Sequence, residues 1–264
     1  MNSVRPFFVA AILLSVTSCG APSGGGASTG DLSSALAGAT APYVVLDLVT
    51  TTYVYQTTVS GLDTDATLRD SQIVFHRATV GGRDVFVSVF EVTQAQWQRI
   101  AGTTPWTSVD TGVVPGTAIA ADRPAYNLDY DAILVALAAF PLAKGATLTV
   151  PTDAEWTAAC SVSSGWSMGS NPTLAQFQAA AVVRETNGGT RGARPVGQRE
   201  ANANGFYDMH GNVWEWTRPG TVVRGGSWHD AAWSSRAEIS TGASQGVDNS
   251  VAHALMGVRL VLVP

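Results

Sequence analysis

The stretch Tyr207–Trp216, with the sequence YDMHGNVWEW, decides the fold of this chain. Two tryptophans, Trp214 and Trp216, flank the carboxylate of Glu215 directly after a Gly-Asn pair. Glycine permits backbone turns that other residues resist, and each tryptophan buries a large surface while its indole N–H needs a partner. We therefore expect Trp214, Glu215 and Trp216 to be structural residues that pin a loop into the core.

The residues upstream of the fold predict an export signal and a linker. Arg5 is followed by the apolar run Phe7–Val16, which is too short to span a bilayer and is typical of a signal peptide. Small residues precede Cys19, as in a bacterial lipobox, which implies cleavage before Cys19 and a lipid on its thiol. The alternative is an ordinary signal peptide. The lipobox interpretation divides the chain into a signal peptide (1–18), a lipidated and flexible Gly/Ser/Ala tether (19–40) and one domain (41–264).

The charge balance narrows the expected binding partners, and the residue after Cys19 narrows the expected cellular location. The chain carries 15 Lys and Arg against 20 Asp and Glu, and no basic stripe, so nucleic acid is not an expected partner. Gly20 follows Cys19, and in a cell with two membranes the absence of Asp there favours the outer membrane or cell surface. Once Cys19 is lipidated, Cys160 is the only thiol left, so no intramolecular disulfide can form.

The periodicity of the domain predicts an α+β fold whose second half is rich in loops. Alternating apolar residues and Thr-initiated capping boxes mark the regular elements. The predicted strands are 43–48, 52–57, 71–79, 85–92, 221–224 and 258–263, and the predicted helices are 94–101, 127–140 and 153–160. Beyond residue 161 we expect only loops, turns and short strands.

Six segments resemble, in order and spacing, the formylglycine-generating enzyme or sulfatase-modifying factor family. They are Phe90–Trp97 (FEVTQAQW), Arg123–Asn127 with the following Asp131-Ala132, Val150–Trp156 (VPTDAEW), Arg194–Gly197, Asn204–Trp216 and Gly257–Leu260 (GVRL). The resemblance covers nearly all of 41–264. It implies the loop-rich variant of the C-type lectin fold in a single domain.

The thiols that the resemblance leads one to expect are missing. Enzymes of this family oxidise a substrate cysteine with oxygen, copper and two thiols, two and seven positions after the aromatic residue of a Gly-Gly-Ser-aromatic motif. That aromatic residue is Trp228 here, so the two positions hold Asp230 and Ser235. Carboxylate and hydroxyl groups are hard donors that do not replace thiolates on Cu(I), so no copper and no catalytic residue is expected. Cys160 is expected to be a buried apolar residue.

Other metal and nucleophile patterns are weaker. The resemblance implies calcium near Asn212 and Glu215, whose oxygens suit a hard cation; the alternative is that Glu215 only accepts hydrogen bonds. His229 lies beside Asp230, where a weak metal site is conceivable. The segment 242–246 (GASQG) fits the G-x-S-x-G pattern but lacks the strand and helix that a nucleophile elbow needs, so we expect a flexible loop.

These observations predict a surface lipoprotein whose degenerate domain binds a protein or glycan ligand. The predicted ligand-binding face consists of Trp228, His229, Asp230, Trp233 and Ser235, with the two tryptophans as anchors. The competing interpretation is that both tryptophans are core residues. Two other functions stay open: an enzyme of the superfamily with a non-copper chemistry that can involve a metal, and an accessory subunit of a surface assembly.

Overall fold

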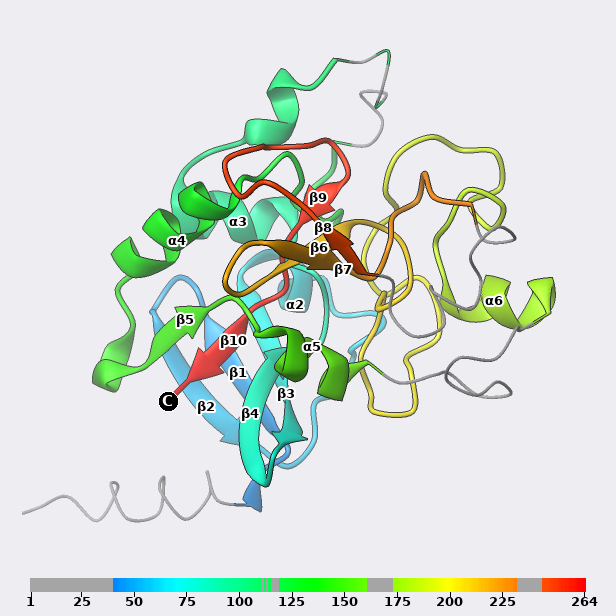
Figure 1. Ribbon diagram of the computed structural model, residues 1–264. Helices are drawn as coiled ribbons and strands as arrows, with labels where there is room; N and C mark the ends of the chain where they lie inside the picture. Colours follow the sequence, from blue (N-terminus) through cyan, green and yellow to red (C-terminus); the bar gives the residue numbers. More distant parts are fainter. Residues whose placement is uncertain (1–39, 111, 113, 115–118, 161–172, 232–243) are drawn as a thin grey trace, which may run out of the picture.

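The computed structural model of the chain describes residues 40–110, 112, 114, 119–160, 173–231 and 244–264. A six-stranded antiparallel sheet has the order β2-β1-β3-β4-β10-β5, and a smaller sheet has the order β8-β7-β6-β9 (Figure 1). The strands of the larger sheet are β1 Tyr43–Asp47, β2 Thr52–Gln56, β3 Gln72–Val80, β4 Arg83–Ser88, β5 Thr147–Thr149 and β10 Val261–Val263. Those of the smaller sheet are β6 Trp214–Thr217, β7 Val222–Arg224, β8 Ser244–Gly246 and β9 Met256–Gly257.

The larger sheet is buried on both faces, which explains the nearly continuous apolar residues of its strands. Side chains of a strand alternate between faces, so Val44 and Leu46 point into the main core while Val45, between them, packs in a second cluster with Val74. The main core extends from this sheet across to the smaller one, where it includes Trp216. The two sheets therefore share one core, and the predicted α+β fold is confirmed.

The helices lie around these sheets, and four of them begin at a Thr or Asp cap. Helix α3 (Gln94–Ala101) starts at the capping box of Thr93, and α5 (Asp153–Ala159) starts at that of Thr152, as predicted. The other helical elements are α2 Thr67–Asp70, η1 Pro105–Ser108, α4 Tyr130–Ala139, η3 Ala143–Gly145 and α6 Leu174–Ala180. In Figure 1, α3 and α4 lie beside the smaller sheet, and α6 lies at the far side of the molecule beyond long loops.

Several predicted boundaries are wrong for identifiable reasons. Helix α4 begins at Tyr130 rather than 127, because Asn127 has a left-handed φ of 62° and Asp129 caps the helix. Strand β4 ends at Ser88, four residues early. The second half is more regular than predicted, since it contains α6 and β6, and Ser244 of the expected flexible loop lies in β8. In the described part of the chain, no helix is long and apolar enough to cross a membrane.

Candidate functional site

The signature stretch is held by a buried ion pair between β6 and the segment before β10. Glu215 Oε1 accepts from Arg259 Nη2 at 2.8 Å, and Glu215 Oε2 accepts from Arg259 Nε at 2.9 Å. Trp156 of α5 donates its indole N–H to Glu215 Oε2 at 2.6 Å. Arg259 also donates to the backbone carbonyls of Ser88, Val89 and Tyr207, each at 2.8 Å. One guanidinium therefore ties the larger sheet, the smaller sheet and the signature loop together.

Two further buried carboxyl groups surround this ion pair. Glu91 accepts from Asn212 Nδ2 at 2.6 Å and from the backbone N–H of Val213 at 3.0 Å. Asp208 Oδ2 accepts from the N–H of Gly197 at 2.6 Å, and Asp208 Oδ1 has no hydrogen-bond partner. Burial, followed by the charges of Asp208 and Glu215, raises the pKa of Glu91 well above its usual value. Burial raises the pKa of Asp208 to about 6, against the hydrogen bond from Gly197. Burial in this cluster therefore favours the protonated forms of Glu91 and Asp208.

The side chains of Asn212 and Glu215 do not fit the predicted calcium site. Both oxygens of Glu215 accept from the cationic Arg259, and Asn212 Oδ1 accepts from the N–H of Arg194 at 2.8 Å. Neither side chain keeps an oxygen directed away from protein donors, and a calcium ion at Glu215 would lie beside a positive charge. Among the described residues, no group of three or more His, Cys, Asp or Glu side chains is arranged to hold a metal ion. Calcium binding stays a prediction that chelation can test.

The predicted ligand-binding face divides between the core and the surface. Trp228 is 4% exposed, belongs to the main core and donates its backbone N–H to Asn212 O at 2.9 Å, so its indole is not an exposed anchor. His229 is exposed, and its ring meets the Trp228 ring edge-on at 5.4 Å. Trp233 and Ser235 lie outside the described residues.

Asp230 serves as the cap of a tight turn. Its Oδ2 accepts from both the N–H and the hydroxyl of Ser227, each at 2.7 Å. Its backbone carbonyl accepts from the N–H of Arg184 at 3.0 Å, which joins the turn to the loop after α6. The carboxylate at the first thiol position of the family therefore has a structural use. Asp230 directly follows exposed His229 in the sequence, so the two residues lie side by side, and metal binding by them stays a prediction.

A buried thiol and a half-buried imidazole lie elsewhere in the described part of the chain. Cys160, the cap residue at the end of α5, is buried as predicted, and burial raises the pKa of its thiol to about 12. His76 lines a hollow of about 530 Å³ with Asn204 and Phe206. Its ring stacks on Tyr43 at 4.4 Å, and its Nδ1 lies 2.9 Å from Asn204 O. Burial lowers the pKa of His76, against the hydrogen bond with Asn204, and the ring also packs against Phe206 at 5.4 Å.

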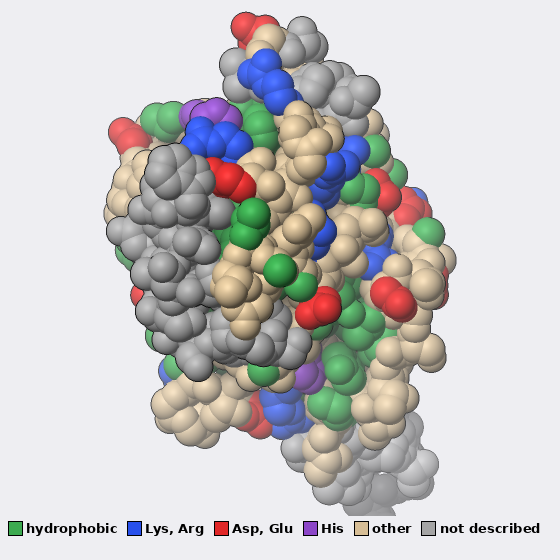
Figure 2. Space-filling model, turned by 90° about the vertical axis from the view of Figure 1, so that its right-hand side faces the viewer, with side chains coloured by type: hydrophobic (Ala, Val, Ile, Leu, Met, Phe, Trp, Pro, Cys, Tyr) green, Lys and Arg blue, Asp and Glu red, His purple; other side chains and the backbone are tan. Residues whose placement is uncertain are grey.

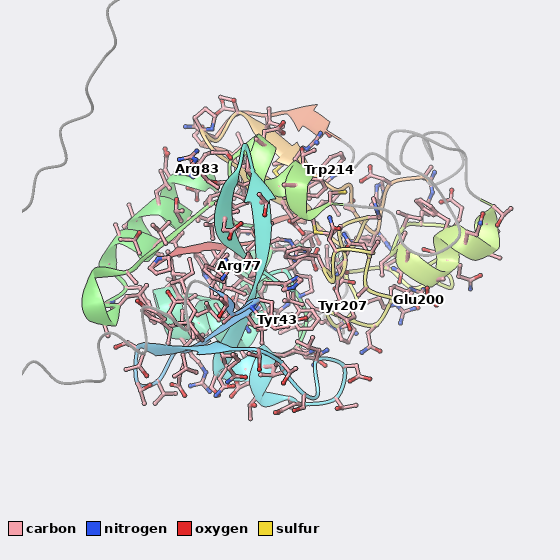
Figure 3. All side chains as sticks on the ribbon, turned by 90° about the horizontal axis from the view of Figure 1, so that it is seen from below. Tyr43, Arg77, Arg83, Glu200, Tyr207 and Trp214 are labelled. Atoms are coloured by element: carbon pink, nitrogen blue, oxygen red, sulfur yellow. The ribbon has the colours of Figure 1, made fainter. Side chains whose placement is uncertain are left out.

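Sequence reasoning missed the acidic members of the buried cluster. Glu91 follows the mostly apolar residues 85–90, and Asp208 shortly precedes the Gly-Asn pair. A single acidic residue in an apolar stretch is the sequence signal that could have revealed a buried carboxyl group. Figure 3 shows Tyr207, the neighbour of Asp208, close to Tyr43 of β1, and the two tyrosines pack on the same apolar cluster. The acidic cluster around Glu215 and Arg259 therefore lies directly against the larger sheet, where Arg259 bonds the carbonyl of Ser88 in β4.

Comparisons with known proteins agree on the fold. A model of the "Sulfatase-modifying factor enzyme 1-like domain" matches residues 55–263. The solved structure of Treponema denticola variable protein 1 superposes with a TM-score of 0.53 at 19% identity, over 73% of this chain and 96% of that one. PvdO from Pseudomonas aeruginosa superposes with a TM-score of 0.51 at 16% identity, over 78% of this chain and 89% of that one. No curated protein sequence matches the chain. At these identities the solved structures show the fold alone.

Proposed function

The chain belongs to the sulfatase-modifying factor enzyme 1-like family, and we propose that it is a lipid-anchored envelope protein whose domain binds a protein or glycan without catalysis. The observation that carries this proposal is the state of Asp230. Its carboxylate closes a turn through two hydrogen bonds from Ser227 at the position where the family resemblance leads one to expect a thiol. A capped carboxylate is neither a copper ligand nor a free nucleophile.

Thiol chemistry has no other source in the sequence. The chain contains two cysteines, Cys19 and Cys160, and the proposed lipid occupies the thiol of Cys19. The thiolate is the reactive form of cysteine, and a pKa of about 12 leaves the Cys160 thiol protonated at neutral pH. The oxidation of a substrate cysteine by two active-site thiols is therefore not available to this chain.

The proposed binding face is centred on His229 and continues onto the loop after α6. His229 is exposed, and the side chain of Arg184 is 56% exposed at the point where its backbone bonds Asp230. Trp233 and Ser235 remain proposed members of this face. Trp228 contributes by supporting the turn from the core. An imidazole and a guanidinium on a rigid turn offer hydrogen bonds to the carbonyls of a peptide or to the hydroxyls of a sugar.

Affinity capture tests the binding face. The full chain, purified and immobilised, is exposed to solubilised envelope of the native cell, and bound protein and glycan are identified by mass spectrometry. His229→Ala and Arg184→Ala should each reduce recovery of the same partner at least tenfold, while Arg83→Ala, an exposed arginine on the β3–β4 hairpin, should not. Equal recovery by all four proteins would reject this face.

An activity assay tests the absence of catalysis. The full chain is incubated with copper, oxygen and a cysteine peptide of the sulfatase type, and the peptide is weighed. We expect no conversion above the protein-free control. Conversion of the cysteine to formylglycine, abolished by Asp230→Asn, would instead establish an enzyme with a different set of ligands.

A further inference from the structure

Three arginines from two parts of the chain hold the same glycine-rich loop, Thr186–Ala193. Arg199 Nη2 donates to Thr186 O at 2.7 Å, and Arg194 Nη2 donates to Asn187 O at 2.7 Å. Arg123, which precedes α4, donates Nη1 to Ala193 O. Since all three side chains end on one eight-residue loop, their guanidinium groups are gathered on one side of the molecule. Figure 2 shows one face of the molecule, on which Lys and Arg side chains in blue lie among Asp and Glu side chains in red.

The charges of these arginines are not neutralised by ion pairs. The ion pairs among the described residues include none that contains Arg123, Arg194 or Arg199. Their acceptors are carbonyl, amide and hydroxyl oxygens, which orient a guanidinium without cancelling its charge. Burial and then the positive charge of Arg194 lower the pKa of Arg199. The pKa of Arg123 is likewise lowered, first by burial, with Asp122 opposing and Arg194 adding to the effect.

Acidic groups near the arginines offset part of this charge, since Asp122 raises the pKa of Arg123 and Asp208 raises that of Arg199. Asp122 adjoins Arg123 in sequence and lines a separate hollow with Asp63 and Asp70. Asp208 acts on Arg199 only as the third and weakest influence on its pKa, and it belongs to the buried cluster around Glu215. None of these acidic groups, all in the described part of the chain, forms an ion pair with the three guanidiniums, so the positive charges are only partly offset on a chain whose formal net charge is −5.

Several guanidinium N–H groups remain available to a ligand. Arg123 Nη2, Arg194 Nη1, and both Nε and Nη1 of Arg199 donate to no protein atom in the part of the chain that the structure describes. All three residues are half-buried, and their hydrogen bonds to the loop fix the positions of the guanidinium groups. Fixed, partly desolvated guanidiniums lose little conformational entropy on binding, and their planar forks match the oxygens of phosphate and carboxylate groups.

The loop itself is rigid enough to hold this arrangement. Asn187 is 1% exposed, and its Nδ2 donates to Thr190 O at 2.7 Å and Gly192 O at 3.0 Å, which closes the loop on itself. Asn187 Oδ1 accepts from Arg194 Nε at 2.5 Å. Glycines at positions 188, 189 and 192 have left-handed φ values of 61°, 73° and 96°, which lets the carbonyls face the arginines.

We propose that Arg123, Arg194 and Arg199 form an oxyanion-binding site for a phosphate group on the Thr186–Ala193 loop. The ligand supplies the ion-pair partner that these three guanidiniums do not have among the described side chains. A phosphate dianion has enough oxygens to accept from more than one guanidinium at once, which a single carboxylate does less well. The site differs from the face around His229 in both residues and ligand chemistry. The phosphate is either free or carried by a lipid headgroup.

Binding of inorganic phosphate to the full chain tests the site. Thermal melts and calorimetric titrations are run in phosphate and in sodium chloride at matched ionic strength, which separates binding from screening. The wild-type melting temperature should rise with phosphate beyond the chloride control. Arg199→Gln should weaken phosphate binding at least tenfold, because it removes one charge and a single bond to Thr186. Arg83→Gln is the matched control and should change binding less than twofold; Figure 3 shows Arg83 well apart from Glu200, the neighbour of Arg199.

The outcomes separate a binding site from a purely structural clasp. Arg194→Lys keeps the charge but loses the fork to Asn187, so phosphate binding should fall while the melt without phosphate reports whether the loop still folds. A wild type that responds equally to phosphate and chloride, and that also binds no vesicle containing phosphatidylglycerol, would overturn the site. An Arg199→Gln variant that binds phosphate as well as wild type would overturn it as well. In a second arm, vesicles of phosphatidylcholine with and without phosphatidylglycerol are added. Binding that needs the anionic vesicle assigns the phosphate to a headgroup, and binding of inorganic phosphate alone assigns it to a free ligand.

Discussion

At the scale of single residues, Asp208 links stability to pH. Its pKa is raised by burial from 3.8 to about 6, so the folded state holds a proton that the unfolded state releases. This stabilisation is complete below pH 3.8 and is lost as the pH rises through 6. Glu91 beside it is shifted in the same direction, so the cluster as a whole favours mildly acidic conditions.

Asp208→Asn should flatten this pH dependence. Asparagine can still accept the hydrogen bond from Gly197 and tolerates the left-handed φ of 59°. Relative to wild type, the variant should gain on the order of 3 kcal/mol in unfolding free energy between pH 4 and pH 7.5, since it never ionises. Urea unfolding at several pH values measures the difference. Parallel stability curves for the two proteins would show that Asp208 does not titrate in this range.

Trp216 is predicted to be indispensable for packing. Its side chain is fully buried in the main core, and its indole N–H donates to Leu128 O at 2.9 Å. Trp216→Ala should lower the unfolding free energy by about 3–5 kcal/mol, the usual range for deleting a large buried aromatic. Val135→Ala, at a side chain that is 72% exposed, is the control and should change it by less than about 0.5 kcal/mol. Chemical denaturation of both variants checks the contrast.

Glu215→Gln should leave Arg259 as an unpaired buried cation. Removing one partner of a buried ion pair costs about 3–5 kcal/mol, because the other charge stays desolvated. The loss should be the same with and without a chelator if the ion pair is the cause. A chelator that destabilises wild type but not Glu215→Gln, together with calcium found by elemental analysis, would restore the calcium prediction.

The residue roles show what the sequence can and cannot predict. The composition of Tyr207–Trp216 was enough to predict that Trp214 and Trp216 are buried, and both are. It was not enough to find the partner of Glu215, since Arg259 lies 44 residues away and reaches carbonyls up to 171 residues away. Trp228 was placed on an exposed face because its neighbours are small and polar, yet the fold turns it into the core.

At the scale of elements, local capping chemistry was the reliable signal. The Thr93 and Thr152 boxes correctly predicted α3 and α5. The same box at Thr173 and Gln176 starts α6, and it was missed because the surrounding residues suggested loops. Strand β6 was missed for a different reason: its four residues, WEWT, do alternate, but they are fewer than a strand pattern needs to stand out, and the Gly-Asn pair before them suggested a loop.

Gly211 determines how closely the signature loop can approach its neighbour. A Cβ at this position would lie 2.1 Å from the backbone carbonyl oxygen of Val182, and φ is 97°. Gly211→Ala should therefore cost more than about 3 kcal/mol, or prevent folding, because backbone cannot move aside cheaply. Gly82→Ala shares a positive φ of 78° but meets nothing within 4 Å, so only backbone strain of about 1–2 kcal/mol is expected. Comparable melting of the two variants would contradict the close approach.

At the scale of the whole molecule, Cys19 is proposed to decide where the domain lies. Cys19→Ala should abolish fatty-acid labelling and move the protein from the membrane fraction to the soluble fraction, because one residue provides the only attachment site. Metabolic labelling and fractionation of wild type and variant provide the measurement. A wild type that carries no label and fractionates like the variant would favour the ordinary signal peptide.

The fold was predictable over the whole domain because six short motifs, from Phe90–Trp97 to Gly257–Leu260, occur in the family's order. The function was less predictable because the same motifs are structural. They supply the caps of α3 and α5 and the buried ion pair of Glu215 with Arg259, which hold the fold whatever ligand the domain takes. The proposed ligand contacts come instead from side chains such as exposed His229 and half-buried Arg194, whose setting appears only once distant loops are assembled.

The order of the larger sheet has a consequence for how the protein is made. Strand β10 is formed by residues 261–263, yet it lies between β4 and β5, where Val261 pairs with Val87 and Thr149. Until these strand residues have been synthesised, β4 and β5 each lack a neighbour and the sheet has a gap beside its edge strand. Contacts between residues so far apart in sequence form slowly and late. A partly synthesised chain therefore keeps unpaired strand edges until residues 261–263 join the sheet, and such edges pair readily with other chains.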